Sequence, residues 1–426
     1  MTDTTTTTAN PLLDPLFAGT VGDMVGNYIL RGTLGPPGRG IGSVWRATPA
    51  EDDDAPVCLK VARSGTNYES SWRVELACLR ATASCAGIVD LAAHFMFVNP
   101  ATQQTHPCHA IGWVPGGDLF DTMQRNPCLL TPARCIAITG EILDAVAYLH
   151  GGMGEGWKVV HNDLKPENIL MGADGHIRLT DFGSASILHG CDPDVLGERT
   201  RWVQKFGQTT DYRSVEIICG PSVTTAADIW AVGCILFELL THGETLFTDG
   251  EADHDDDSGA SRGSRYACDG EDDEDDEDGE DDEDDEDGEN DDDDEDGSAD
   301  SADSADSDYD ANEAGDIVQL LVIRECLGPF PSALTRAYPE LFSRSGSLRF
   351  HRLCESGAPE DLIDARPGSL TVADRLRDAG VAGDFDMLFA PMLRMNPMHR
   401  ATATAMRDVI ESLPGLVDDA VQHGAQ

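Results

Sequence analysis

The chain of 426 residues has few basic side chains: 29 lysines and arginines stand against 78 aspartates and glutamates, for a formal charge of −49. Direct binding of nucleic acid needs a basic surface, so this balance argues against it and favours basic partners instead. Residues 249–316 alone hold 37 acidic and 2 basic residues in 68 positions. The rest of the chain is only mildly acidic, and an apolar fraction of 40% is sufficient for a hydrophobic core.

Long apolar runs are also missing. The N-terminal sequence MTDTTTTTANPLLDP has neither the basic nor the apolar segment of a secretory signal. The most apolar run, residues 231–240, covers about half of a bilayer span and predicts a buried helix. We therefore expect no membrane segment and an intracellular protein, in the cytoplasm, the nucleus or both.

The 12 cysteines follow no disulfide framework. Several, such as Cys78 and Cys234, stand inside apolar periodic stretches, which is typical of small core residues in a reduced protein. The nearest approach to a metal cluster is the sequence HPCH at residues 106–109, but no second pair follows at zinc-finger spacing. We expect a loop that enters a strand at this point.

The first third of the chain has a strand-rich pattern. Residues 1–27 are rich in threonine and predict a disordered lead. After them, short β-like runs surround one helical stretch at residues 72–80. The β-like runs are residues 28–34, 42–47, 57–61, 88–91, 94–98 and 110–114.

The remainder of the chain is mainly helical. Residues 132–150 form an amphipathic pattern of helix length with a proline at its start, and further helical patterns are at residues 317–327, 385–393 and 401–413. The acidic run at residues 249–316 cannot bury apolar surface or tolerate its own charge when compact, so it predicts a disordered insertion. The whole pattern predicts an α+β fold of two lobes with a cleft between them. The predicted units are a domain at residues 28–413, divided into a β-rich small lobe (28–111) and a helical large lobe (112–413), and a C-terminal tail (414–426).

Two motifs carry chemistry. Residues 161–170 read HNDLKPENIL, and residues 181–183 read DFG. Phosphoryl transfer needs an acceptor hydroxyl in line, metal ions in place and an offset of the charge on the transferred group. The residue types fit these tasks: Asp163 can accept the proton of the hydroxyl, Lys165 can neutralise the γ-phosphate, and Asn168 with Asp181 can hold Mg²⁺ through oxygen atoms. Asp and Asn are common in turns, but this set at this spacing indicates transfer of a phosphoryl group.

These motifs resemble the catalytic and metal-binding segments of the eukaryotic protein kinases, and other segments agree in order. Val57-Cys58-Leu59-Lys60 is similar to the strand that carries the lysine ligand of the α- and β-phosphates, which makes Lys60 that ligand. The resemblance implies a glutamate on the following helix as its ion-pair partner. We expect Glu75, because the competing Glu69 precedes the apolar helical pattern.

The resemblance also implies an ATP site. Residues 113–119, WVPGGDL, resemble the hinge beside the adenine pocket, with Ile111 at the back wall, the backbone of residues 112–114 against the adenine and Asp118 near the ribose. Residues 38–44, GRGIGSV, resemble the phosphate loop but are one residue short between the second and third glycines, which leaves the exact contacts open. The implied ATP-binding residues are Leu34, Gly38, Gly40, Gly42, Val44, Lys60, Ile111, Val114 and Asp118.

Two further matches are structural. Asp228 and Gly233 match the buried helix that anchors the catalytic loop of these kinases. Glu216 and Arg400 match the ion pair that ties the activation segment to the large lobe. In addition, Asn162 stands where many kinases have an arginine that reads an activation-loop phosphate, so switching by such a phosphate is less expected.

Softer similarities narrow the family to the SR-protein kinases, relatives of the cyclin-dependent and MAP kinases. They are residues 209–216 (TTDYRSVE), 325–331 (ECLGPFP), 341–348 (LFSRSGSL) and 391–397 (PMLRMNP). This resemblance implies Ser/Thr phosphorylation of protein substrates rich in Arg and Ser. The bias toward Ala, Gly and Asp would suit a gene from a large DNA virus or a GC-rich microorganism.

Alternatives stay open at two points. The acidic segment is a solvating spacer, an electrostatic attractor of Arg-rich substrates, or a docking or localisation element. The chain is a serine/threonine kinase using ATP and Mg²⁺, or else a pseudokinase or an acidic docking scaffold that binds basic partners. The enzyme is favoured because every catalytic position carries the expected residue, and a scaffold has no need of all four: Lys60, Asp163, Asn168 and Asp181. The sequence indicates neither the physiological substrate nor the oligomeric state.

Overall fold

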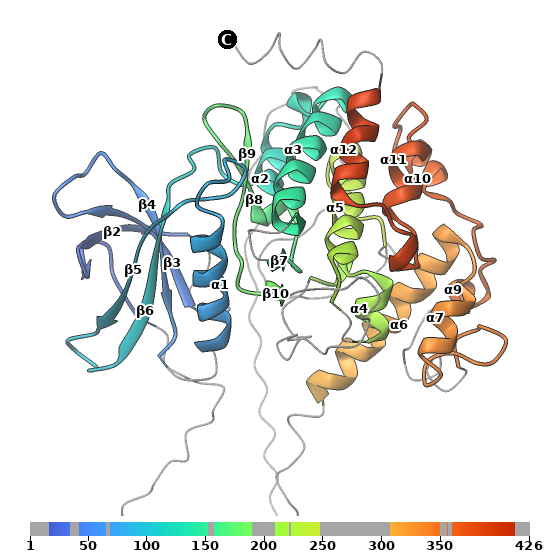
Figure 1. Cartoon of the computed structure of the whole chain (residues 1–426), viewed down its shortest axis with the longest axis horizontal. Coiled ribbons are helices and arrows are strands. Elements are labelled where there is room, and N and C mark those ends of the chain that lie inside the picture. Colours follow the sequence, from blue (N-terminus) through green and yellow to red (C-terminus); the bar gives the residue numbers. More distant parts are fainter. Residues whose placement is uncertain are drawn as a thin grey trace, which may run out of the picture.

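The computed structural model describes residues 17–34, 42–64, 69–151, 157–189, 209–220, 223–247, 307–349, 356 and 360–413. A strand-rich lobe with helix α1 lies beside a larger helical lobe (Figure 1). The two lobes agree with the predicted α+β architecture. Gly38, Gly40, the acidic residues 249–306 and the tail at residues 414–426 lie outside the described residues, so the predictions that concern them stay predictions.

The small lobe is a six-stranded antiparallel sheet in the order β1-β2-β3-β4-β6-β5. Its strands are β1 (Met24–Val25), β2 (Tyr28–Thr33), β3 (Gly42–Pro49), β4 (Val57–Ala62), β5 (Leu91–Val98) and β6 (Thr105–Gly112). Leu59 and Val61 alternate with half-buried neighbours on β4, so one face of this strand meets the core. Helix α1 (Glu69–Ala81) begins three residues before the predicted range and packs Cys78 and Leu79 into the interior.

The predicted start of the small lobe at residue 28 is wrong. Phe17 is 5% exposed and meets Trp45 and Phe97 edge-on, with ring centroids 6.4 Å and 5.6 Å away. Val25, on the two-residue strand β1, is completely buried. Residues 17–27 therefore belong to the small lobe, and they were missed because so short a strand has no detectable alternation.

The large lobe is built around helix α5 (Thr225–Thr241), which is buried along almost its whole length as the apolar run predicts. Helix α3 (Pro132–His150) packs beside α5 and begins with Thr131 as its N-cap, whose hydroxyl accepts the N–H of Arg134. The other helices are α2 (Leu119–Arg125), α4 (Val215–Cys219), α6 (Ser307–Leu327), α7 (Ser332–Ala337), α9 (Glu360–Asp364), α10 (Val372–Asp378), α11 (Asp386–Met392) and α12 (Ala403–Ser412). Two small antiparallel sheets of two strands each lie where the lobes meet (Figure 1): β7 (Trp157–Val160) pairs with β10 (Ser186–His189), and β8 (Ile169–Met171) pairs with β9 (Ile177–Leu179).

The acidic insertion ends earlier than residue 316, its predicted boundary. Helix α6 begins at Ser307, and Asp316 lies inside it. The carboxylate of Asp316 pairs with Arg213 at 2.8 Å, and each side chain is less than 15% exposed. A carboxylate with a fixed cation partner does not oppose folding, so this acidic residue belongs to the folded lobe. Among the described helices, none is long and apolar enough to cross a membrane.

Candidate active site

The loop that carries HNDLKPEN follows β7 and is held by one buried carboxylate. Asp228, 1% exposed on α5, accepts the backbone N–H groups of His161 and Asn162 at 2.9 and 3.0 Å. The same carboxylate lies 2.7 Å from Nε2 of His150 on α3. Because α5 is the central helix of the lobe, this network fixes the loop relative to the core, as the sequence match at Asp228 implies.

Asp163 lies among polar groups at the end of this loop. Its Oδ1 accepts the backbone N–H of Thr209 at 3.3 Å, and its Oδ2 lies 3.5 Å from Nζ of Lys165. Lys165 in turn donates to the hydroxyl of Thr209 at 2.8 Å. The sequence does not reveal this role of Thr209, because a separation of 46 positions hides its contact with Asp163.

The two candidate metal ligands are adjacent. The amide nitrogen of Asn168 donates to the backbone carbonyl of Asp163 at 2.7 Å and to its Oδ2 at 3.2 Å. The amide oxygen is thereby left without a hydrogen-bond donor among the described residues. The backbone carbonyl of Asn168 accepts the N–H of Thr180 at 3.0 Å, which brings Asp181 beside it. One free amide oxygen and one carboxylate are the hard oxygen ligands that Mg²⁺ prefers, so these residues fit the ion.

Lys60, on β4, joins the lobes. Its ammonium lies 2.6 Å from Oε1 of Glu75 and 2.9 Å from Oδ1 of Asp181. Glu75 is completely buried on α1, so it and not Glu69 is the partner, as expected. Burial alone would lower the pKa of Lys60, but the carboxylates of Asp181 and Glu75 outweigh burial and raise it, so the lysine stays charged.

Asp181 is held in its ionised form. The Lys60 ammonium lowers the pKa of Asp181 to about 2 from the usual 3.8. The stabilising contribution of this pair is therefore present above pH 3.8 and is lost only as the pH falls toward 2. The backbone of Asp181 is left-handed, with φ of 63°, and the next residue, Phe182, is completely buried against His161 with ring centroids 4.9 Å apart.

The described residues of the expected ATP site in the small lobe lie on β3, β4 and β6 and just after β2. Val44 is opposite Lys60 in the β3–β4 register, and the N–H of Leu34 bonds to the carbonyl of Val44 at 2.8 Å. Ile111 is 2% exposed near the end of β6. Gly42 begins β3 so close to the backbone of Val61 that a side chain would clash with the carbonyl oxygen.

The hinge leads from β6 into α2. Val114 is half-buried and packs against the core of the large lobe. Asp118 caps α2 by accepting the N–H of Asp121 at 2.7 Å. Burial raises the pKa of Asp118, and the nearby carboxylates of Asp121 and Glu167 add to this effect. These contacts fix Asp118 at the start of α2, directly after the hinge.

The expected loop at HPCH is wrong, because residues 106–109 lie inside strand β6. His106 Nδ1 lies 2.8 Å from the carbonyl of Ala62, whereas the ring of His109 stacks on Trp72 of α1. The two histidines therefore contact different partners. Pro107 and the polar neighbours hide the strand, since proline is rare inside sheets; here Pro107 pairs only with Met96 of β5, and the pairing with β4 starts at Cys108.

The side chain of Asn162 makes its hydrogen bonds without any phosphate on the activation segment. Its left-handed backbone, with φ of 65°, directs the side-chain amide to the carbonyl of Ser184 at 3.0 Å and the hydroxyl of Ser186 at 2.8 Å. The start of the activation segment is therefore tied to the catalytic loop by neutral hydrogen bonds.

We expect the protein to be active without phosphate on its activation segment. The measurement is the phosphorylation rate of bacterially produced protein after phosphatase treatment, with mass spectrometry showing that Thr209, Thr210 and Tyr212 are unmodified. Activity that disappears with the phosphates would contradict the role inferred for Asn162.

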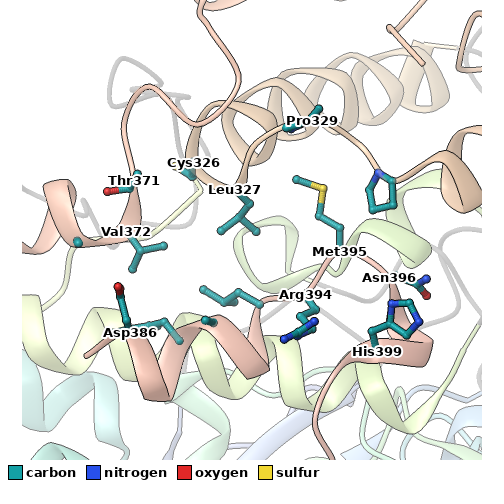
Figure 2. Close-up of a pocket in the computed structure, with 15 residues that line it drawn as sticks. Cys326, Leu327, Pro329, Thr371, Val372, Asp386, Arg394, Met395, Asn396 and His399 are labelled. Atoms are coloured by element: carbon teal, nitrogen blue, oxygen red, sulfur yellow. The ribbon is translucent and has the colours of Figure 1, made fainter. Parts of the chain in front are cut away.

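A concave site lies away from these residues, on the large lobe. Its volume is about 470 Å³, and it is bounded by the end of α6, the start of α10, helix α11 and the loop before Arg400. Figure 2 shows Arg394 and His399 on one side and Leu327 and Val372 on the other. None of the residues expected to bind ATP or metal lines it.

A bilobal fold in which a lysine–glutamate pair, an aspartate base and two oxygen ligands converge defines the class of ATP-dependent protein kinases. Residues 36–409 match the family model described as the protein kinase domain, and the chain belongs to this family.

Similar proteins include phototropin-2 of Oryza sativa subsp. japonica, which is 34% identical over 164 residues, 34% of this chain and 17% of that protein. The 3-phosphoinositide-dependent protein kinase 1 of Rattus norvegicus is 42% identical over 102 residues, 24% of this chain and 16% of that protein. The cAMP-dependent protein kinase catalytic subunit PRKX of Homo sapiens is 37% identical over 137 residues, 32% of this chain and 34% of that protein. The aligned part thus spans about a third or less of these relatives.

Proposed function

We propose that this chain is a serine/threonine protein kinase that transfers the γ-phosphoryl group of ATP to protein hydroxyls. The observation that carries the proposal is the double contact of Lys60 with Glu75 and Asp181, at 2.6 and 2.9 Å, together with the hydrogen bond that Asn168 donates to Asp163 at 3.2 Å. Relatives named as serine/threonine kinases support the acceptor type.

Each residue has one task in this proposal. Asp163 orients the acceptor hydroxyl and accepts its proton, and Lys165, 3.5 Å from it, offsets negative charge on the transferred group. Lys60 binds the α- and β-phosphates, and Glu75 holds Lys60 in place. Mg²⁺, bound by Asn168 and Asp181, would neutralise phosphate charge. The hinge backbone and Ile111 enclose the adenine, and Leu34, Val44 and the glycines cover the nucleotide from the small lobe.

The test is phosphorylation of a peptide array by the purified protein with ATP and Mg²⁺, with an Asp163→Asn variant as the blank. Label on Ser or Thr peptides that the variant does not produce supports the proposal. No transfer by the wild type, together with normal nucleotide binding, would instead indicate a pseudokinase scaffold.

A basic, Arg/Ser-rich substrate of the SR-protein kinase type is the finer part of the proposal. Acidic side chains near the hinge support it, because the carboxylates of Asp121 and Glu167 lie close enough to Asp118 to raise its pKa. The acidic segment adds to this support because helix α6, which follows it, contacts the residues just after Thr209. In this helix, Asp316 pairs with Arg213 at 2.8 Å, and Gln319 donates to the carbonyl of Thr210. The chain would act inside the cell, which agrees with its scattered free cysteines.

Deleting residues 251–306 should weaken kcat/KM for an Arg/Ser-rich peptide and leave kcat on a short neutral peptide almost unchanged. The deletion removes charge but retains α6 and every residue assigned to the site. Because screening removes long-range attraction, the loss should shrink as salt rises from about 50 to 200 mM. A replacement of equal length rich in Gly and Ser controls for the connection itself. A loss that is independent of salt, or no loss, would make the segment a spacer.

A further inference from the structure

One oxygen of the buried Glu75 has no donor. Its Oε1 bonds to Lys60, but Oε2 has no hydrogen-bond partner in the described part of the chain. An unpaired oxygen on a fully buried carboxylate destabilises the fold, because water no longer solvates it and no donor replaces the water. A polar group that can reach it is Nδ1 of His109, which lies 3.7 Å away.

His109 is equally isolated. It is completely buried on β6, opposite Lys60 on β4 and His94 on β5, and neither ring nitrogen has a hydrogen-bond partner among the described residues. Its ring stacks on Trp72 of α1, with centroids 3.6 Å apart and planes 18° from parallel. Trp72 and Glu75 are neighbours on one face of α1 because they are three residues apart. The imidazole therefore contacts α1 at both residues.

We propose that His109 is a positioning residue for the lysine–glutamate pair, donating a hydrogen bond from Nδ1 to Oε2 of Glu75 and so holding Oε1 against Lys60. A small shift of α1 toward the sheet brings the 3.7 Å separation into hydrogen-bond range. The proton must be on Nδ1, since a lone pair there would face a carboxylate lone pair. This inference rests on the proposed kinase function, in which the pair serves ATP.

The charges facing His109 make the contact sensitive to acid. Burial disfavours the imidazolium most, Glu75 on α1 favours it, and Lys60 on β4 and His94 on β5 disfavour it. The pKa of His109 is lowered from 6.5 as a result, so the ring is neutral at pH 7. A histidine whose pKa is lower in the folded than in the unfolded protein makes its full contribution to stability above pH 6.5. This contribution is lost as the pH falls through the pKa of the folded protein. Protonation also places a second cation beside Glu75, in competition with Lys60.

The first experiment reads the ring directly. Side-chain NMR of the full chain with ¹⁵N-labelled histidine reports tautomer and titration, and the spectrum of His109→Asn assigns the signals. We expect the Nδ1–H tautomer at pH 7.5 and a midpoint below pH 6.5. The Nε2–H tautomer, or a midpoint at or above 6.5, would overturn the inference. The NMR measurement does not require phosphoryl transfer. A protein without kinase activity would therefore refute the proposed function, while the NMR result would still test the role of His109.

The second experiment separates the donor from the stacked ring. His109→Phe keeps an aromatic ring on Trp72 but has no donor, and we expect kcat to fall roughly tenfold with little change in KM for the peptide. His109→Asn keeps a donor near the Nδ1 position and does not titrate. It should retain most of the activity at pH 7.5 and lack the fall in kcat that the wild type shows below pH 6.5. Equal losses of kcat in both variants would contradict the proposal. So would a wild-type pH profile without a fall in kcat below pH 6.5, which we call the acid limb.

His106→Asn is the matched control. His106 is also fully buried on β6, but its Nδ1 lies 2.8 Å from the carbonyl of Ala62, and among the described residues no carboxylate pairs with it. The variant should lower the thermal midpoint and keep the acid limb. If it removes the limb as His109→Asn does, the limb does not come from His109 and the inference fails.

Discussion

Asp163→Asn and Lys60→Met should each lower the rate of phosphoryl transfer by roughly 100-fold or more, with little change in stability. The amide cannot accept the acceptor proton, although it can keep the hydrogen bond from Thr209 N that Asp163 accepts at 3.3 Å. Methionine fills the volume of Lys60 but has no charge to bind phosphate or to pair with Glu75 and Asp181. Initial rates with a Ser/Thr peptide measure the effect, and thermal unfolding checks the fold.

Asp384→Asn is the control for the loss of a carboxylate. Asp384 is exposed, and its contact is to the N–H of Asp386 at the start of α11. Its variant should transfer phosphate at the wild-type rate. Near-wild-type activity of Asp163→Asn would remove Asp163 from the role of base, and near-wild-type activity of Lys60→Met would remove Lys60 from ATP binding.

Arg400→Met should destabilise the large lobe by about 3–5 kcal/mol, because it leaves a buried carboxylate without its cation. Arg400 and Glu216 lie 2.7 Å apart, and their side chains are 0% and 3% exposed. The guanidinium also donates to the carbonyls of Ala226 and Arg394 and lies 5.0 Å from the centre of the Trp230 ring. Chemical denaturation measures the free energy of unfolding.

Two variants show whether charge is the cause. Arg400→Met combined with Glu216→Gln removes both charges and should be less destabilised than Arg400→Met alone. Arg407→Met removes a more exposed pair, in which Arg407 is 29% and Asp144 55% exposed at 2.7 Å, and should cost no more than about 1 kcal/mol. Equal losses from Arg407→Met and Arg400→Met would contradict the importance given to the buried pair.

The chemistry could be predicted from the sequence because its residues are clustered in short motifs. Asp163, Lys165 and Asn168 lie on one loop, and the apolar phase of α1 is sufficient to choose Glu75 over Glu69. Contacts between distant segments could not be predicted. Nothing local connects Thr209 to Asp163, and nothing in a Thr-rich lead marks Phe17 as a core residue.

The predicted limits of β6 and α6 were wrong for a related reason. Strand β6 is buried on both faces along most of its length, so it has no alternation to detect, and Pro107 argues against a strand. Helix α6 starts at Ser307 in a run of acidic residues, where composition alone predicts disorder. Its acidic residue Asp316 is stable there because Arg213, more than a hundred positions earlier, pairs with it.

The left-handed backbone at Asn162 has a consequence for how this catalytic loop could have diverged. With φ of 65°, the position requires a conformation that most residues with a side chain adopt only at a cost, and asparagine is among those that adopt it most readily. An arginine at this position would bear that cost and would be useful only once a phosphate binds it. Exchange of arginine for asparagine relaxes the backbone and removes the phosphate reader in a single substitution. Loss of a switch and a more favourable loop conformation would then have the same origin.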